Sequence, residues 1–429
     1  MSPINPYKQS GFQGTCQFPQ ITSQGLEDSW QHGKDLFGVY HDLLGFLPSD
    51  AANKVTFRVT NNQITSQVAG MLINGMLGIN EDFPLAIQPT GVDSLEPQYS
   101  CPTGSNLFNS IKSGAGWNAH LTAAAPLFST LDNISGVSPS DGGWHVSFDH
   151  YYDNLSARQC HAKPLPCKVV NGSNTTTCIT QDLADDVYRL GHYEYSYIYR
   201  DDSRSLQASA ATFGVWIAEL ANNIRSYVAG KSNIIYRHNI AHDGSMSRLL
   251  SIMQVDMMVW PGMGSEVVFE VYKKDDSVPS TTVTTLVTAT PTVAPNCNRD
   301  NCLRQLIQQS SAVSGFCKTY TTAVASQTSL PAFVSQCGGN ASRVSSACSC
   351  IVAPSATSTA TSAQATPTSG TGSESQSGYY VRVLWGGQIL RSSNPSLGYM
   401  EMLPLETLLE YFDGLAGKNA SGVRANCGN

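Results

Sequence analysis

Basic residues and long apolar runs are both scarce in this sequence, and each shortage excludes a class of protein. The 429 residues include 25 Lys and Arg against 32 Asp and Glu, a formal net charge of -7. No long basic tract occurs, so we expect no nucleic-acid partner. No apolar run reaches the roughly 20 residues that a helix needs to cross a bilayer, so we expect no membrane span. An acidic chain can still bind an anionic substrate, because only the pocket must be basic.

The start of the chain lacks a signal peptide, although the rest of the sequence is typical of a secreted protein. Residues 1–6 (MSPINP) have neither a basic start nor an apolar stretch. Twelve cysteines are many for a cytosolic protein of this length. Six Asn-x-Ser/Thr sequons begin at Asn133, Asn154, Asn171, Asn174, Asn340 and Asn419. Together they predict a secreted, disulfide-bonded glycoprotein, extracellular or in the cell wall. Either the sequence is truncated at its start or this compartment prediction is wrong.

Several common functional motifs are absent as well. The sequence has no Walker-type glycine loop and no Gly-x-Ser-x-Gly elbow. Six cysteines lie between Cys297 and Cys350, with no C-x-x-C spacing and no histidine among them, which argues against a zinc site. We expect three disulfides that staple a small helical module. Such modules resemble accessories of fungal secreted proteins and would allow association with a cell wall.

The distribution of Ser, Thr and Pro divides the chain into a body and an insertion. Residues 275–296 and 352–377 are rich in these residues and are predicted to be disordered linkers around the six-Cys module at 297–351. Strand-like runs end at Tyr272 and begin again at Tyr379. We expect these to be neighbouring strands whose hairpin loop the insertion replaces, because loop tips tolerate insertions. The main body is then 1–274 and 378–429.

The body itself predicts an α/β fold. Helical patterns over 25–47 and 63–77 flank a short strand at 54–59, and a strong amphipathic helix around 213–224 precedes an apolar run at 234–236. Strand patterns are rare from about 80 to 185. We therefore expect a doubly wound, mostly parallel sheet with an inserted, mainly helical subdomain at about 78–225. Alternating tyrosines at 193, 195, 197 and 199 are predicted to dock within that subdomain.

A His-Asp pair marks the most informative position. His242 and Asp243 follow the apolar run at 234–236 and precede a helical stripe of Met246, Leu249, Leu250 and Met253. Open α/β sheets bind ligands at the carboxyl ends of their strands. A helix N-terminus there favours a phosphate or another anion. The alternative is a structural histidine followed by an Asp that caps the helix. The same dipeptide at His41-Asp42 is predicted to be a solvated helix position.

Arg58 is the second candidate. It lies near the end of the strand at 54–59, before the polar turn at 60–62. A guanidinium fork suits bidentate phosphate contacts. On local evidence alone, a surface arginine is the alternative.

In order and spacing, these elements resemble the histidine acid phosphatases, the two-histidine branch of the histidine phosphatase superfamily. The resemblance rests on a helix start at 20–25 (QITSQG), the element at 57–60 (FRVT), and the His-Asp motif at 242–245 (HDGS). The strand at 265–270 (SEVVFE) and a fungal-type stretch from 155 to 167 add to it. It covers most of the body and none of the six-Cys module.

The resemblance implies hydrolysis of a small phosphomonoester through a phosphohistidine intermediate, with no cofactor and no metal. Arg58 would clamp the phosphoryl oxygens, and His242 would stabilise charge in the transition state. Asp243 would protonate the leaving alkoxide and then activate water. An acidic optimum is expected, because Asp243 must carry a proton.

Two departures from the family pattern matter. The family's nucleophile lies in an Arg-His-Gly-x-Arg-[Ser/Thr]-Pro motif. Here Ser2-Pro3 matches the tail of that motif, while Met1 stands at its second arginine. We therefore expect the nucleophile segment to be missing through truncation, and the chain as given to be inactive and to fold poorly. Ile64 also stands where many relatives have an arginine.

Two alternatives stay open. A phytase would apply the same chemistry to inositol polyphosphates, although the body is poor in the lysines that such a substrate favours. An inactive pseudoenzyme or cell-wall binding protein would instead use the six-Cys module.

Overall fold

The computed structural model describes residues 11–12, 21–78, 83–275 and 377–428, together with a few residues between 316 and 348. The chain divides into two compact units, one formed by 1–274 with 369–429 and the other by 275–368. In the second unit the described residues are helical and include the disulfide between Cys317 and Cys348. The other four cysteines of the predicted module, and residues 276–296 and 352–376 of the predicted linkers, lie outside the described residues.

The strands of the first unit form a parallel sheet, an antiparallel sheet and a small hairpin. The parallel sheet has the order β2-β1-β5, with the bounds β1 Val55–Val59, β2 Leu85–Ile87 and β5 Tyr236–Ile240. The antiparallel sheet comprises β6 Val267–Lys273, β7 Tyr379–Trp385, β8 Gln388–Ile389 and β9 Leu403–Pro404. The hairpin pairs β3 Cys167–Val170 with β4 Ser173–Cys178. The prediction of a mostly parallel sheet is therefore wrong for the described strands. A short connection joins β7 to β8, and such a connection favours antiparallel neighbours.

The pairing of β6 with β7 confirms that the insertion separates two neighbouring strands. Their register runs from Val267 opposite Trp385 to Lys273 opposite Tyr379. Beyond the last pair, the Lys274 N–H donates to the carbonyl of Gly378 at 2.8 Å. The two ends of the insertion are thus adjacent, so inserting a long segment here leaves the strand pairing intact.

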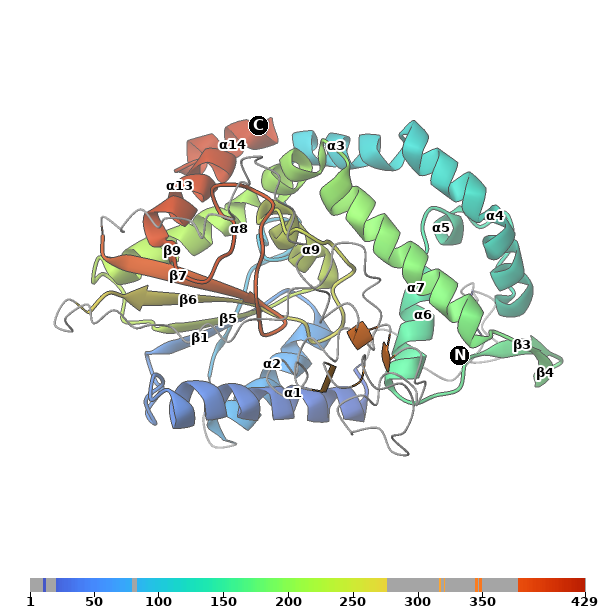
Figure 1. The fold of residues 1–429 in the computed structure, drawn as a ribbon, viewed down its shortest axis with the longest axis horizontal. Helices are drawn as coiled ribbons and strands as arrows, with labels where there is room; N and C mark the ends of the chain where they lie inside the picture. Colours follow the sequence, from blue (N-terminus) through green and yellow to red (C-terminus); the bar gives the residue numbers. More distant parts are fainter. Residues whose placement is uncertain are drawn as a thin grey trace. The chain divides into compact units, whose positions relative to one another are not determined.

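Helices cover both sides of the sheets (Figure 1). In that view α1 and α2 lie along one side of the strands, and α8, α9 and α13 lie along the other. The bounds of the helices, including two π-helical turns named η, are α1 Ser23–Phe37, η1 Gly38–Leu43, α2 Gln63–Leu77, α3 Pro102–Lys112, α4 Ala115–Ser135, α5 Gly142–His145, α6 Asp149–Cys160, α7 Gln181–Ser196, η2 Tyr197–Asp201, α8 Ser205–Val228, α9 Asp243–Ile252, α13 Leu405–Ala416 and α14 Ala420–Cys427.

Local signals explain several of these boundaries. The side chain of Asn62 accepts from the Ile64 N–H and caps α2, whose predicted range of 63–77 is confirmed. The strand predicted from Ile234 begins instead at Tyr236. Apolar residues at 234–235 precede the β1–β5 ladder, whose register starts with Val55 opposite Tyr236.

Two glycines let α1 and α2 pack with their backbones in contact. A Cβ atom on Gly33 would overlap the carbonyl oxygen of Leu72, and one on Gly75 would overlap that of Trp30. Only glycine permits so close an approach. This crossing fixes α2, and with it the turn that connects β1 to α2.

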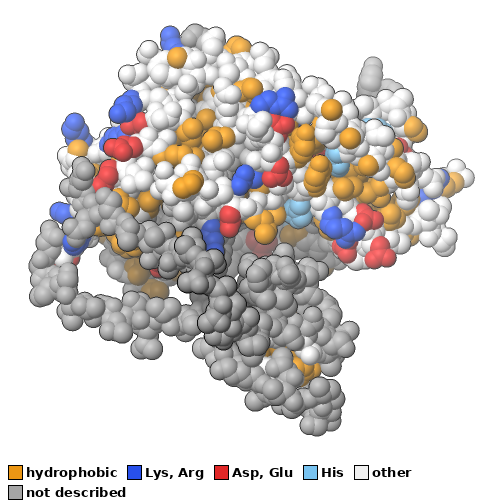
Figure 2. Space-filling view, turned by 45° about the horizontal axis from the view of Figure 1, so that its top comes forward, with side chains coloured by type: hydrophobic (Ala, Val, Ile, Leu, Met, Phe, Trp, Pro, Cys, Tyr) orange, Lys and Arg blue, Asp and Glu red, His pale blue; other side chains and the backbone are white. Residues whose placement is uncertain are grey.

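The main core lies between α8, α9, α13 and β7. Ile217, Leu250, Val383, Leu408 and Phe412 are among its fully buried members. None of the helices in the described ranges is both long and apolar enough to cross a bilayer. On the face drawn in Figure 2, the visible Lys and Arg side chains lie singly or beside Asp and Glu rather than in one basic patch.

Two disulfides link residues in the described part of the first unit. Cys101 at the start of α3 pairs with Cys427 in α14, and Cys167 pairs with Cys178 across the β3–β4 hairpin. Cys160 is exposed and free. The hairpin disulfide is local, because its two cysteines are only 11 residues apart.

Candidate functional site

The carboxyl ends of β1 and β5 meet at one edge of the parallel sheet. Val59 lies opposite Ile240 in the register, and the Thr60 N–H donates to the Ile240 carbonyl at 3.3 Å. The next side chains beyond this point come together, since Thr60 Oγ1 lies 3.2 Å from His242 Nε2. This edge of a parallel sheet is where ligands bind in open α/β folds.

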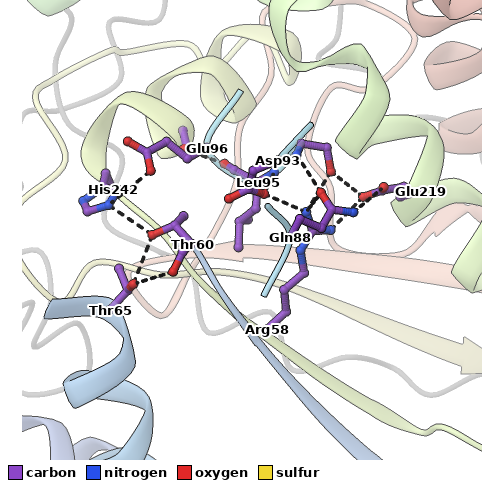
Figure 3. Close-up of polar contacts among 11 residues, drawn as sticks. Arg58, Thr60, Thr65, Gln88, Asp93, Leu95, Glu96, Glu219 and His242 are labelled. Carbon is purple, nitrogen blue, oxygen red and sulfur yellow. Dashed lines mark hydrogen bonds and ion pairs between the residues drawn. The ribbon is translucent and has the colours of Figure 1, made fainter. Parts of the chain in front are cut away.

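His242 is the N-cap residue of α9 and has an extended backbone conformation. Its side chain is 33% exposed, and its Nε2 lies 3.8 Å from Glu96 Oε2. Thr60 Oγ1 also lies 3.0 Å from Thr65 Oγ1 in α2. We call Thr60, Glu96 and His242 the His242 cluster (Figure 3). It presents an accessible imidazole at a helix N-terminus, where an anion is favoured.

Asp243 is held by three hydrogen bonds. Its Oδ2 accepts from the Tyr195 hydroxyl and from Trp260 Nε1, both at 2.6 Å, and its Oδ1 accepts from the Gly244 N–H at 2.7 Å. Burial raises the pKa of Tyr195, so that hydroxyl remains a donor. The two aromatic donors come from outside α9, and a simple helix cap would not require them.

An aromatic stack supports these donors. The Trp260 ring lies between Tyr152 and Tyr195, with centroid distances of 4.0 and 4.1 Å. A Cβ atom on Gly191 would collide with Tyr152, so glycine leaves room for the stack. Tyr195 therefore contacts the candidate site, and the prediction that it docks within the subdomain is wrong for this residue.

A second carboxyl lies beside Asp243. Desolvation and the charge of Asp243 raise the pKa of Asp153, in α6, to about 6. A carboxyl with such a pKa exchanges protons in the mildly acidic range. Perturbed carboxyls of this kind are common at functional sites.

Arg58 points away from His242 into a network of its own (Figure 3). Its Nη1 donates to Glu219 at 2.7 Å, and its Nη2 donates to Gln88, Ser94 and Asp93 at 2.7, 2.8 and 3.0 Å. We call these five residues the Arg58 cluster. The Asp93 side chain is fully buried, so its charge needs the guanidinium as partner.

Residues 93–96 connect the two clusters. Asp93 and Ser94 bind Arg58, whereas Glu96 faces His242. Between them, the Leu95 carbonyl accepts from Ser245 Oγ of α9 at 2.7 Å. Arg58 and His242 thus share a sheet edge and a connecting segment without touching each other.

Sequence reasoning missed five residues that contact or flank the candidate site: Glu96, Asp153, Tyr195, Trp260 and Glu219. Each is distant along the chain from its partner. Tyr195 belongs to the series of alternating tyrosines, but that pattern does not indicate a contact with Asp243. Among the described residues, no group of three or more His, Cys, Asp or Glu side chains is arranged to hold a metal ion.

Comparison with known proteins gives distant similarities. No family model matches the chain. Counting factor 60 of Dictyostelium discoideum is 26% identical over 277 residues, which cover 62% of this chain and 62% of that protein. The chain therefore spans less than two thirds of the length of this relative.

The similar solved structures include phytases. The phytase from Citrobacter braakii has a TM-score of 0.45 and 13% identity, with 64% of this chain and 76% of that chain covered. The Klebsiella sp ASR1 phytase has a TM-score of 0.44 and 17% identity, with 61% and 70% covered. At these values neither similarity assigns a reaction to this chain.

Proposed function

We propose that this protein hydrolyses phosphomonoesters by the mechanism of the histidine acid phosphatases, with His242 and Asp243 at its active site. The observation that carries the proposal is the geometry of the sheet edge. An accessible histidine and a firmly held carboxylate stand side by side at a helix N-terminus, beyond the carboxyl ends of two parallel strands. The motifs at 57–60 and 242–245 both lie at this edge of the sheet, and they follow each other along the chain in the order that the resemblance implies.

His242 would donate a hydrogen bond to an equatorial phosphoryl oxygen and stabilise the charge that develops on it. Glu96 Oε2 lies 3.8 Å from His242 Nε2, so this carboxylate helps to orient the imidazole ring. Asp243 would protonate the leaving oxygen and then activate water. Its two aromatic donors fix the carboxyl in one orientation. The nucleophile in the family's mechanism is the histidine of an Arg-His-Gly motif, which does not occur in the printed sequence.

Arg58 would bind phosphate through its Nη2 group. Two of the partners of that group, Gln88 and Ser94, are neutral acceptors that a phosphoryl oxygen could replace. A charged acceptor forms the stronger bond with a guanidinium. Asp93 and Glu219 would meanwhile hold the side chain in place.

The test is the hydrolysis of p-nitrophenyl phosphate by the full natural chain between pH 4 and 7. We expect His242→Ala to lower kcat at least 100-fold, because removal of a preorganised donor costs about 10²- to 10³-fold. His41→Ala is the matched control, since His41 also precedes an Asp and should leave the rate unchanged. Equal rates for the two variants would contradict the proposal.

The same assay separates the alternatives that the sequence leaves open. A strong preference for phytate over simple phosphomonoesters would favour the phytase alternative. No turnover of either substrate by the natural chain would favour a binding protein. We also propose secretion, which the Cys101–Cys427 and Cys167–Cys178 disulfides support.

A further inference from the structure

A cavity lined by two cations and no acidic residue lies beside α9. It has a volume of about 240 Å³ and lies between α3, η2, α8 and α9. Lys112 and Arg248 are its two cations. The other lining residues in the described chain are neutral: Pro97, Tyr99, Cys101, Ser105, Phe108, Asn109, Tyr199 and Thr212. A protein with a net charge of -7 has few basic residues, so two of them facing one cavity are informative.

Arg248 is fixed in place at the wall of this cavity. Its Nε donates to Thr212 Oγ1 at 3.2 Å, and its Nη1 donates to the Gly244 carbonyl at 2.7 Å. The guanidinium carbon lies 5.2 Å from the ring centre of Phe108 and 5.9 Å from that of Tyr199. These contacts preorganise the cation, so little side-chain entropy is lost when a ligand binds.

The charge of Arg248 is not neutralised by an ion pair within the described chain. Its Nη2 forms no hydrogen bond to the described residues, which leaves two N–H donors for a ligand. Asp243, the acidic residue nearest along α9, directs its oxygens at Tyr195, Trp260 and the Gly244 N–H. A partly buried cation without a carboxylate partner is suited to bind an anion.

One face of α3 completes the cavity. Ser105, Asn109 and Lys112 project from it, and all three are exposed at the cavity mouth. They offer a hydroxyl, an amide and an ammonium group. Phe108 and Tyr199 supply aromatic surface, with ring centroids 5.6 Å apart. The lining therefore combines anion donors with an apolar wall, as small-molecule sites do.

We propose that this cavity binds a small organic oxyanion, with its phosphate-type group between Arg248 and Lys112 and its apolar part against Phe108. The site is distinct from the candidate active site, because none of Thr60, Glu96, His242 and Asp243 lines the cavity. The proposal does not depend on catalysis. Arg248 binds the carbonyl of the residue that follows Asp243, which gives an occupied cavity direct contact with the start of α9.

The test uses phenylphosphonate, whose P–C bond is not a hydrolysable ester, in calorimetric titrations of the full chain. The titrations are made in the His242→Ala background, which removes the histidine of the candidate active site. We expect saturable binding, and weaker binding of methylphosphonate because it lacks the ring. Asn109→Asp should weaken binding of phenylphosphonate at least tenfold, since a carboxylate in the cavity repels the ligand. Lys112→Met should weaken it about threefold or more, because one of the two cations is lost.

Asn106→Asp is the matched control, because Asn106 is an exposed residue of the same helix that does not line the cavity. It should change the affinity less than twofold. Three results would overturn the proposal. The first is the absence of saturable binding. The second is equal affinity of the Asn109→Asp and Asn106→Asp variants for phenylphosphonate. The third is binding that requires His242 but is unaffected by Asn109→Asp. The last result is checked by repeating the titrations with His242 present, and it would place the probe at the candidate active site.

Discussion

The Arg58 cluster and the His242 cluster follow neighbouring parallel strands, yet one is closed and the other is open. In the Arg58 cluster two carboxylates and two neutral acceptors surround a guanidinium that is 16% exposed. In the His242 cluster the imidazole is 33% exposed and meets one hydroxyl and a carboxylate at 3.8 Å. Both side chains lie near the carboxyl end of a parallel strand, so position in the sheet alone does not decide which one is free to bind a ligand.

The difference arises from the segment that crosses the sheet edge. Asp93 is fully buried, and a buried carboxylate requires a cation as partner. Arg58 supplies that partner first and can bind phosphate only with the donors that neutral groups occupy. Glu96, three residues later, is partly exposed and leaves His242 accessible.

The largest expected effect is on stability and comes from removing the guanidinium of the Arg58 cluster. Arg58→Met should lower the free energy of unfolding by about 3–5 kcal/mol, because it leaves Asp93 buried without a partner. Urea denaturation of the variant measures this loss. The double variant Arg58→Met/Asp93→Leu should regain part of the stability, since it removes the unpaired charge. If Arg58→Met were as stable as the parent protein, Arg58 would not be held as described.

The next largest effect concerns the hydrogen bonds that hold Asp243, the residue that follows His242. Trp260→Phe preserves an aromatic ring between Tyr152 and Tyr195 but removes the Nε1–H donor to Asp243. We expect kcat for phosphomonoester hydrolysis to fall about tenfold, because a hydrogen bond to a charged group contributes about 1.5–3 kcal/mol. Tyr152→Phe is the control, since Tyr152 stacks on the same ring without a hydrogen bond to Asp243. Equal rates for the two variants would show that the donor is not needed.

The smallest expected effect concerns His238, which lies inside β5 and precedes His242 in the chain. Burial lowers the pKa of His238, inside β5, to about 4. The unfolded chain therefore takes up a proton between pH 6.5 and 4 that the folded chain does not. The stability from neutral His238 is complete above pH 6.5 and is lost as the pH falls towards 4.

His238→Phe should consequently reduce the drop in Tm between pH 7 and pH 5. His32 contributes the opposite dependence, because its hydrogen bond with Glu266 raises its pKa. That contribution is fully present below pH 6.5 and is lost as the pH rises through the raised pKa of His32. His150→Phe, at an exposed position, serves as the control. If the Tm of His238→Phe fell as much between pH 7 and pH 5 as that of the parent protein, His238 would not be buried and neutral as described.

Local sequence patterns predicted the elements and the strand ends that carry the clusters. The helix at 63–77 followed from its apolar spacing and the polar turn before it, and the β6–β7 pairing followed from strand patterns on both sides of the insertion. Periodicity and caps act over a few residues, so a sequence expresses them directly.

The partners of the predicted site residues could not be found in this way. Trp260 and Tyr195 reach Asp243 from 17 and 48 residues away, and Glu219 reaches Arg58 from 161 residues away. Such contacts depend on how α7, α8 and the loop after α9 pack together. The parallel sheet was also overestimated, because the second sheet is built from short antiparallel connections that carry no distinct periodicity.

The central claim is that Asp243 supplies the proton to the leaving oxygen, and its most direct test varies the leaving group. Glycerol phosphate has a poor leaving group that needs this proton, whereas p-nitrophenolate leaves without it. Rates of both substrates would be measured for the full natural chain and for Asp243→Asn. We predict a loss about 100-fold greater for glycerol phosphate, within the range of general acid catalysis. Equal losses for the two substrates, or no loss for either, would contradict the claim.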